Sequence, residues 1–147
     1  MVKSKGGFYI SRIKQVQDRV FCKMLENAGI DISSGQGRIL YVLWQESPLS
    51  IGEIGKRASL AKTTMTAMLK RLESKGIVLR TFDKLNKRQI NVSLTIEAEH
   101  MKERYQKVSD DMTQVFYKGF SNLEIIEFEK KLGKILNNLI VKEAEGN

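Results

Sequence analysis

Polar and positively charged side chains recur along residues 62–71, between apolar residues at helical spacing. Lysine and arginine neutralise phosphates, and threonine hydrogen-bonds phosphate or base edges while its methyl group packs on thymine. These residue types therefore suit contact with a nucleic-acid duplex. The candidates in this stretch are Lys62, Thr63, Thr64, Thr66, Ala67, Lys70 and Arg71.

A second group of polar and charged residues follows at 83–88, where the candidates are Lys84, Asn86, Lys87 and Arg88. Most charge clusters are only the solvated face of an element, and either group alone fits that interpretation. The second group, however, comes directly after the first, at the expected tip of a hairpin. We therefore expect the two groups to form one DNA-binding surface, with the hairpin tip at the minor groove.

A helix-turn-helix is predicted to position the first group. Ser50 and Glu53 have the spacing of a capping box, which starts a short helix that closes at Ser59. Apolar residues at positions 65, 68, 69 and 72 then form the buried stripe of a helix over 62–75, and Gly76 ends it. In this motif the second helix enters the major groove.

Residues 77–94 change to the period of extended strands. The segment 77–82 is rich in β-branched and other apolar side chains, and Ile90, Val92 and Leu94 alternate with polar residues. The polar stretch 83–88 joins the two segments. The pattern predicts a β-hairpin with a charged tip, which completes a winged helix-turn-helix lobe over residues 33–95.

Longer helices flank this lobe. Residues 8–28 and 34–46 have amphipathic patterns, and Ser33 with Gln36 has the spacing of a capping box that starts the second of these helices. Two helices with heptad-like apolar stripes follow Thr95 and Ser121, and Ser121 with Glu124 repeats the capping signal. The expected class is mainly α (α+β), with four helices, two strands and two helices in that order. The 147 residues fit a single domain, in which 8–28 and 96–143 are the dimerisation helices.

The flanking helices predict a homodimer, because their apolar stripes exceed what one small core can bury. A second copy of the chain is the simplest partner for them. The residues expected in this interface are Tyr9, Ile13, Phe128, Leu132, Ile135, Leu136 and Leu139.

Composition and charge argue against several other classes. The 25 Lys and Arg against 17 Asp and Glu give a net charge of +8, which favours a polyanionic partner. One cysteine and one histidine, Cys22 and His100, form neither an intrachain disulfide nor a zinc site, and they offer no catalytic constellation. We expect no enzyme, cofactor or metal. No apolar run is long enough to cross a bilayer and residues 1–7 lack a signal peptide's apolar stretch, so we expect a cytoplasmic protein.

Several short strings follow one another at defined spacing between residues 50 and 95: Leu60-Ala61-Lys62-Thr63-Thr64-Met65-Thr66, Lys70-Arg71-Leu72-Glu73-Ser74-Lys75-Gly76-Ile77-Val78, Asn86-Lys87-Arg88 and Val92-Ser93-Leu94-Thr95. Together they resemble the MarR family of winged-helix repressors, and the helix order extends the resemblance to residues 8–142. The resemblance implies a homodimer that binds a pseudo-palindromic operator. It also implies release of the DNA when a small aromatic acid or an oxidant acts.

The sequence departs from the family pattern at three positions. Asn86 stands where the wing usually has the aspartate of an Asp-x-Arg element, so Arg88 lacks the carboxylate that would orient it. Ala67 lies on the second helix of the helix-turn-helix, residues 62–75, which is the DNA-reading helix. The family often has arginine at this position, so one expected contact is missing. Ala98 replaces a common glycine, with little expected effect on function.

The resemblance places an effector pocket between the first helix, the start of the second and the DNA-reading helix. The residues nominated by position are Ile13, Lys14, Val16, Gln17, Gln36, Leu40 and Met68, with Lys14 as the partner of a carboxylate. Tyr41 and Trp44 are expected in the core rather than in this pocket. Cys22 is expected to be a buried, inert thiol rather than an oxidation sensor, and His100 a surface residue.

Two alternatives from other classes compete with this interpretation. An enzyme lacks its catalytic groups, and a helical adaptor that binds another protein would leave the basic helix and hairpin without a role. An architectural DNA-binding protein without an effector stays open, as does an activator in place of a repressor. Binding to the DNA upstream of the chain's own gene separates the DNA-binding interpretations from the rest.

Overall fold

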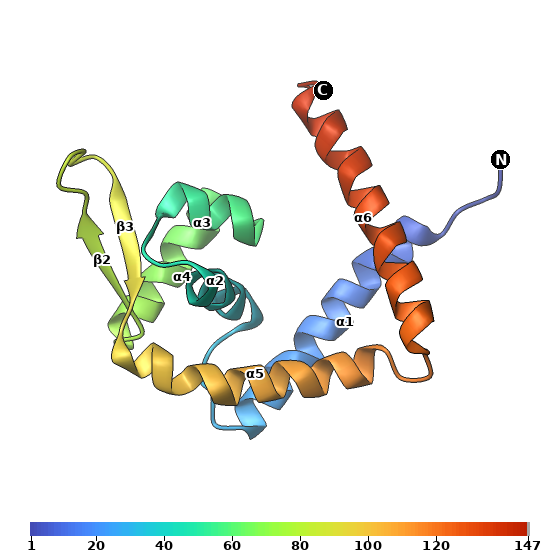
Figure 1. Cartoon of the computed structure of the whole chain (residues 1–147), viewed down its shortest axis with the longest axis horizontal. Coiled ribbons are helices and arrows are strands. Elements are labelled where there is room, and N and C mark those ends of the chain that lie inside the picture. Colours follow the sequence, from blue (N-terminus) through green and yellow to red (C-terminus); the bar gives the residue numbers. More distant parts are fainter. Residues whose placement is uncertain (147) are drawn as a thin grey trace. The chain divides into compact units, whose positions relative to one another are not determined.

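The computed structural model describes residues 1–146 (Figure 1). Its elements follow the predicted order with one addition, a short strand between the second and third helices. They are α1 (Gly6–Asn27), α2 (Ser34–Gln45), β1 (Leu49–Ser50), α3 (Ile51–Ala58), α4 (Lys62–Ser74), β2 (Val78–Phe82), β3 (Ile90–Leu94), α5 (Ile96–Phe116) and α6 (Asn122–Ala144). The mainly helical class and the hairpin predicted from the sequence are confirmed.

The predicted capping signals start three of the helices. At α2 the Gln36 N–H donates to Ser33 Oγ at 3.1 Å, while the Ser33 N–H donates to Gln36 Oε1 at 2.9 Å. The same reciprocal pair starts α6. At α3 only half of the predicted box forms, because Ser50 Oγ accepts from the Glu53 N–H but the Glu53 carboxylate turns to Arg57, 2.9 Å away. Each cap satisfies backbone donors that would otherwise lack a partner.

Glycine ends two of the helices in the left-handed region of backbone space. Gly29 follows α1 with φ +74° and Gly76 follows α4 with φ +72°. Only glycine adopts this conformation without strain, since it has no Cβ to clash with the backbone. The chain therefore turns sharply after each helix, and the turn at Gly76 sends it directly into β2.

The hairpin belongs to a three-stranded antiparallel sheet in the order β1-β3-β2. Along β2 and β3 the register starts with Val78 opposite Leu94, and in β1 Leu49 lies opposite Val92. The sequence prediction missed β1, because two residues show no alternation of polar and apolar side chains. This strand exists only through its pairing with β3, which lies far along the chain.

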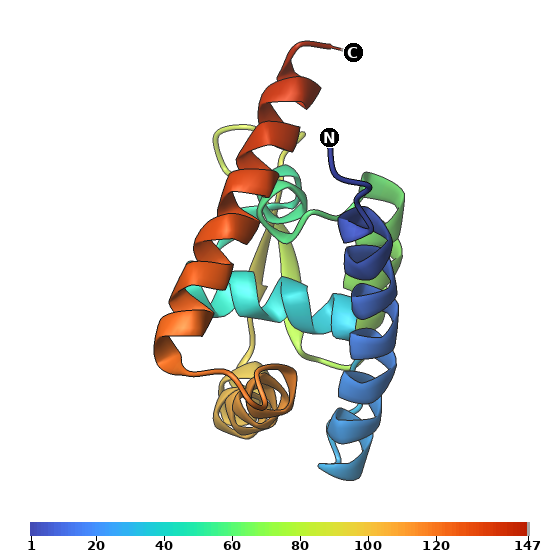
Figure 2. The ribbon, with the colours of Figure 1, turned by 90° about the vertical axis from the view of Figure 1, so that its right-hand side faces the viewer.

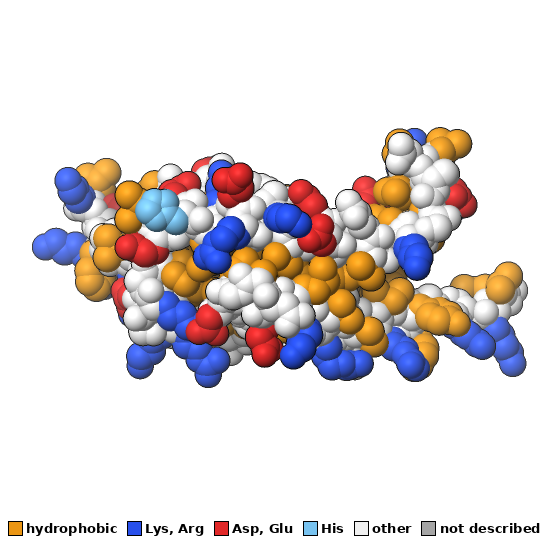
Figure 3. All heavy atoms as spheres, turned by 90° about the horizontal axis from the view of Figure 1, so that it is seen from below, with side chains coloured by type: hydrophobic (Ala, Val, Ile, Leu, Met, Phe, Trp, Pro, Cys, Tyr) orange, Lys and Arg blue, Asp and Glu red, His pale blue; other side chains and the backbone are white. Residues whose placement is uncertain are grey.

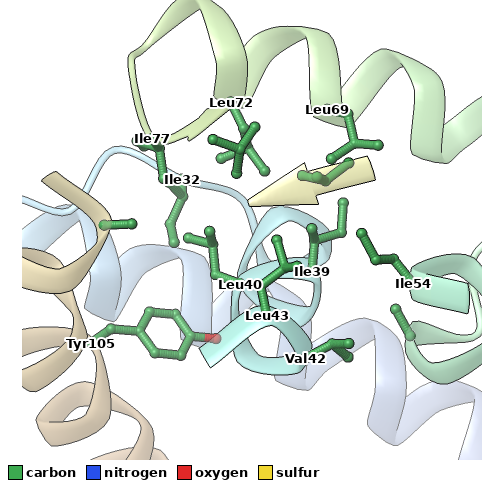
Figure 4. Packing of buried hydrophobic residues seen from close by; sticks show 14 of the residues in the cluster. Ile32, Ile39, Leu40, Val42, Leu43, Ile54, Leu69, Leu72, Ile77 and Tyr105 are labelled. Atoms are coloured by element: carbon green, nitrogen blue, oxygen red, sulfur yellow. The ribbon is translucent and has the colours of Figure 1, made fainter. Parts of the chain in front are cut away.

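The centre of the hydrophobic core is α2. Leu40 and Leu43 have almost no exposed surface, and Figure 4 shows Leu69 and Leu72 of α4 on one side of them and the Tyr105 ring of α5 on another. α2 also contacts β3, and the two hairpin strands pass behind it in Figure 2. Burial of one leucine side chain contributes about 1.5–3 kcal/mol. This shared core fixes α4 and the hairpin relative to each other.

Two compact units make up the chain, Met1–Asp110 and Asp111–Asn147. The first contains the winged helix-turn-helix. In the second, the ring centroids of Tyr117 and Phe120 lie 5.7 Å apart, and the Tyr117 hydroxyl donates to the Glu129 carboxylate at 2.7 Å. None of the α6 residues is fully buried in the described chain. The apolar side chains of α6 therefore remain accessible to a partner.

Two residues lie nearer the surface than the sequence analysis predicted. Tyr41 is 53% exposed rather than in the core, because it lies on the outward face of α2. Cys22 is half-buried, so the prediction of a buried thiol is wrong. It lines a surface pocket of about 450 Å³ together with residues 29–33 of the turn between α1 and α2. The apolar stripe of α1 is less buried here than its pattern indicates.

Other expectations about single residues agree with the structure. The Trp44 ring packs 5.2 Å from the Tyr105 ring, and its Nε1–H donates to the Ala98 carbonyl at 3.2 Å. His100 is exposed, and Figure 3 shows this histidine on the surface of the molecule.

Within residues 1–146, no helix is both long and apolar enough to span a bilayer. No group of three His, Cys, Asp or Glu side chains among these residues is placed to hold a metal ion.

Candidate nucleic-acid interface

A tight turn sets the angle between α3 and α4. Ser59 has φ +53°, which is unusual for a residue with a side chain, and the Leu60 N–H donates to the Gly55 carbonyl at 2.9 Å. A Cβ at Gly55 would lie 3.2 Å from the Leu60 carbonyl oxygen, so this helix position has little room for a side chain. The close approach closes the helix-turn-helix, and α4 is its second helix.

One face of α4 enters the core and the opposite face meets solvent. Met65, Leu69 and Leu72 are fully buried. The Thr66 hydroxyl donates to the Lys62 carbonyl at 2.9 Å, which leaves its oxygen as an acceptor toward a ligand. All of the residues predicted on this helix are exposed: Lys62, Thr63, Thr64, Thr66, Ala67, Lys70 and Arg71.

The wing is the β2–β3 hairpin, and Asp83 organises its tip, residues 83–89. The Asp83 carboxylate accepts the N–H groups of Leu85 at 2.8 Å and Asn86 at 3.0 Å, and the Asn91 amide at 3.3 Å. Two backbone bonds of 2.9 Å, from the Asp83 N–H to Gln89 and from the Gln89 N–H to Asn86, close the loop. The hydrogen bonds from the Leu85 and Asn86 N–H groups hold the pKa of Asp83 below its ordinary value. The predicted tip residues are all exposed: Lys84, Asn86, Lys87 and Arg88.

Asn86 holds the backbone of Arg88. Its side-chain oxygen accepts the Arg88 N–H at 3.2 Å. The sequence analysis concluded that Asn86 removes the carboxylate that would orient the Arg88 guanidinium, although an amide oxygen can still accept a hydrogen bond. The structure instead gives Asn86 a role in the turn, and the carboxylate that organises this tip comes from Asp83.

An ion pair connects the wing to the end of α4. Arg80 of β2 donates from Nε and from one terminal nitrogen to Glu73 Oε1, at 3.1 and 2.8 Å. The hydrogen bond from Arg80 lowers the pKa of Glu73, and the same bond raises the pKa of Arg80. Both groups are about one-third exposed, so solvent screens part of their attraction. The sequence analysis missed this pair, because its partners lie on different elements.

A groove of about 660 Å³ lies between α3, the start of α4 and the wing. Four of its lining residues are cations, namely Lys56, Lys62, Arg80 and Arg88, and none is Asp or Glu. Apolar side chains such as Ile51 and Leu60 form part of its wall. The groove therefore joins the exposed face of α4 to the wing through a positively charged surface, as a phosphate backbone would require.

Sequence reasoning missed Lys56 and Gln89 as parts of this surface. Lys56 lies in the last turn of α3, where it and Arg57 fit the ordinary preference for cations at the end of a helix. Gln89 lies at the base of the tip and lines the groove with Arg88. Only the fold brings them together, since 32 residues separate them in the sequence.

Comparison with known proteins finds the same arrangement elsewhere. The model of the MarR family matches residues 32–90. The regulator TtmR of Methylorubrum extorquens is 40% identical over 72 residues, which cover 49% of this chain and 37% of TtmR. A mutant MarR from E. coli, solved with operator DNA, is 29% identical with a TM-score of 0.80, over 88% of this chain and 92% of that one. Residues 32–90 are therefore similar to the MarR family, and the fold is that of the E. coli MarR structure.

Two further facts qualify the likeness to MarR-family proteins. The chain spans less than two thirds of the length of the curated relatives it matches, 37% for TtmR and 66% for a second relative. BpsR of Bordetella bronchiseptica, whose DNA binding is regulated by 6-hydroxynicotinic acid, is 19% identical with a TM-score of 0.80 over 88% of this chain and 91% of its own. At that identity BpsR demonstrates the MarR-family fold alone.

The effector residues nominated from the resemblance are dispersed over buried, hydrogen-bonded, ion-paired and exposed positions. Leu40 is fully buried, and the Gln36 side chain is occupied by the cap of α2. Lys14 pairs with Asp18 on the surface of α1. Met68 packs closely against Gly35 of α2. Of the remaining nominees Ile13 and Val16 are exposed and Gln17 is half-buried.

The residues nominated for the MarR-family dimer interface lie on α1 and α6. On α6, Phe128 and Leu132 are half-buried, while Ile135, Leu136 and Leu139 are 45%, 58% and 63% exposed. On α1, Tyr9 and Ile13 are 57% and 43% exposed. Each helix thus keeps an apolar stripe in contact with solvent, which is the condition that an interface between copies requires.

Proposed function

We propose that the chain is a cytoplasmic, homodimeric transcriptional repressor that binds a pseudo-palindromic operator and releases it when a small effector binds. The observation that carries the proposal is the continuous cationic surface formed by α4, the groove and the wing. Lys62 of α4 and Arg88 of the wing both line the groove, and its lining includes no carboxylate. A net charge of +8 adds attraction for a polyanion at longer range.

DNA fits this surface better than other polyanions because the two parts of the surface, α4 and the tip of the wing, suit the two grooves of a duplex. A helix such as α4 enters the major groove, and a hairpin tip rich in Lys and Arg reaches the narrower minor groove. The phosphate backbone between the grooves would then cross the cationic groove. The mutant E. coli MarR solved with operator DNA supports this choice of ligand. The regulator names of the relatives agree with the expectation that the chain is not an enzyme.

A homodimer is supported by the apolar stripes of α1 and α6. Leu136, Leu139 and Ile140 of α6 are each more than half exposed. Exposed leucines and isoleucines at helical spacing are costly in water, and a symmetric interface between two copies would bury them. Two copies of α4 would then meet successive major grooves on one side of the duplex, with half-sites about 10 base pairs apart.

The effector is proposed from the family and from BpsR, which responds to an aromatic carboxylic acid. The chain's own nominees are dispersed, so a pocket would form between copies or by a movement of α1. A screen of aromatic carboxylic acids, including 6-hydroxynicotinic acid, tests this part. We expect at least one acid to release a bound duplex. If none acts, the effector part of the proposal fails and DNA binding is unaffected.

The test of DNA binding uses the intact chain and the DNA upstream of its own gene. We expect the logarithm of affinity to fall linearly with the logarithm of salt concentration, with a slope of several units. Replacement of Lys62, Lys70 and Arg71 by alanine should weaken binding and reduce this slope. The matched control replaces the exposed Lys102 and Arg104 of α5, which lie outside the surface, and should change both quantities much less. A salt response that is flat would contradict the proposal.

A further inference from the structure

The tip of the wing exposes a large apolar side chain. Leu85 is 99% exposed, more than the other described leucines, and it lies between cationic and polar neighbours. Single exposed apolar residues are common on protein surfaces. This leucine differs because hydrogen bonds hold the backbone around it in one conformation, so its side chain leaves the tip in a defined direction.

Three hydrogen bonds hold that backbone. Asp83 accepts the Leu85 N–H at 2.8 Å and the Asn86 N–H at 3.0 Å, and the Gln89 N–H donates to the Asn86 carbonyl at 2.9 Å. The Asp83 carboxylate also accepts the Asn91 amide, which anchors the tip to β3. The loop conformation is therefore determined from both sides of Leu85.

The charges around Leu85 identify what could cover it. Lys84, Lys87 and Arg88 belong to the same tip, and the one acidic group there, Asp83, is engaged by N–H donors. A partner must combine negative charge at its edges with an apolar surface a few ångströms inside. The minor groove of duplex DNA has this arrangement, because phosphates border walls made of deoxyribose C–H groups.

We propose that Leu85 enters the minor groove and packs against the deoxyribose walls, beside the Arg88 guanidinium. The inference rests on the proposed function, since it needs the wing to meet DNA. It adds an apolar contact to the cationic contacts already assigned, and it makes Leu85 a residue that favours the unobstructed groove of A·T-rich DNA. The 2-amino group of guanine projects into that groove and would hinder entry.

The experiment measures affinity by fluorescence anisotropy on short duplexes of alternating A·T, I·C or G·C pairs. Inosine lacks the 2-amino group, so I·C pairs keep the major-groove edge of G·C and the minor-groove edge of A·T. We expect Leu85→Ser to lower affinity about three- to tenfold on the A·T and I·C duplexes, as burial of roughly half a leucine would predict. The loss on G·C should be smaller, and Leu85→Met should bind nearly as the parent does.

Two controls separate this contact from charge and from folding. Leu85→Ser should leave the salt slope unchanged, whereas Lys84→Ala should reduce it by about one unit. Leu79→Ser, at a wing leucine that is 52% exposed but away from the tip, should not alter affinity. Circular dichroism should show the same thermal midpoint for the parent and Leu85→Ser.

The outcomes distinguish failure of the inference about Leu85 from failure of the proposed function. If the parent binds DNA and Leu85→Ser binds equally well, the inference is overturned and the proposed function stands. An equal loss on all three duplexes would overturn entry into the minor groove. A change in sedimentation without a change in affinity would assign Leu85 to contact between copies. If the parent binds neither these duplexes nor the DNA upstream of its own gene, both the inference and the proposed function fail.

Discussion

Arg80 and Glu73 join the wing to the last turn of α4. Two guanidinium nitrogens donate to one carboxylate oxygen, at 3.1 and 2.8 Å. The two parts of the proposed DNA surface are thus connected by a polar contact in addition to the core beneath them. Because each element would meet a different groove, their relative position decides whether both contacts form at once.

Loss of this ion pair should loosen the wing. Glu73→Gln removes the charge that holds Arg80, so we expect faster amide hydrogen exchange along residues 78–82. The matched control is Glu53→Gln, which breaks the pair with Arg57 at α3 and should leave exchange in β2 unchanged. Because the pKa of Glu73 is lowered in the fold, the ion pair stabilises the fold fully at pH values above the ordinary pKa of glutamate. Its contribution disappears as pH falls through the lower, folded value. Equal exchange rates in parent and Glu73→Gln would show that the core alone holds the wing.

Arg88 is expected to provide the main cationic contact of the wing. Its guanidinium suits a narrow A·T-rich groove, since it is less strongly hydrated than an ammonium. Arg88→Ala should weaken binding about five- to hundredfold, the usual cost of one specific groove contact. Fluorescence anisotropy at one fixed salt concentration measures the loss, with Arg104→Ala as the control. An Arg88→Ala protein that binds DNA as tightly as the parent would leave α4 as the only element that recognises the DNA sequence.

Asn86→Asp should have the opposite sign to Arg88→Ala. The Asn86 oxygen already accepts the Arg88 N–H at 3.2 Å, and a carboxylate in its place would be a stronger acceptor near the guanidinium. We expect unchanged or slightly tighter binding, despite the added negative charge. The measurement is the same anisotropy titration. A clear loss would mean that charge repulsion from phosphates outweighs orientation of the arginine.

Asp83 should keep the wing tip ordered over the whole neutral range. Bonds from the Leu85 and Asn86 N–H groups favour the carboxylate, so the pKa of Asp83 lies below that of an unfolded aspartate. Its stabilising effect is therefore present above the unfolded pKa of about 3.9 and is lost only as pH falls through the lower, folded value. The amide resonances of residues 85 and 86 should report this titration by NMR, and Asp83→Ala should abolish it. A midpoint above about 4 would contradict the role given to Asp83.

The apolar stripe of α6 should hold the dimer together. Leu139 is 63% exposed in the single chain, and Leu139→Asp would place a charge in the proposed interface. We expect sedimentation to show a dimer for the parent at micromolar concentration and a monomer for the variant, with Leu136→Asp acting similarly. Leu79→Asp, on the wing, should remain dimeric. A monomeric parent would refute the proposed architecture.

Local patterns in the sequence were sufficient to predict most elements of this chain and the exposed face of α4. Ser33 with Gln36 marked the start of α2, Gly76 marked the end of α4, and alternation marked β3, because each signal depends on backbone geometry within a few residues. The cations of α4 and the wing could be named for the same reason. Their exposure follows from the helical and strand periods once the apolar residues are buried.

The tertiary structure alone decided which distant residues meet. β1 exists through its pairing with β3, Arg80 of the wing reaches Glu73 of α4, and Lys56 of α3 shares a groove with Arg88. Each of these contacts depends on how separate elements pack, and no local period encodes it. The exposure of Cys22 and Tyr41 was misjudged for the same physical reason: an apolar position on a helix is buried only where a neighbouring element covers it.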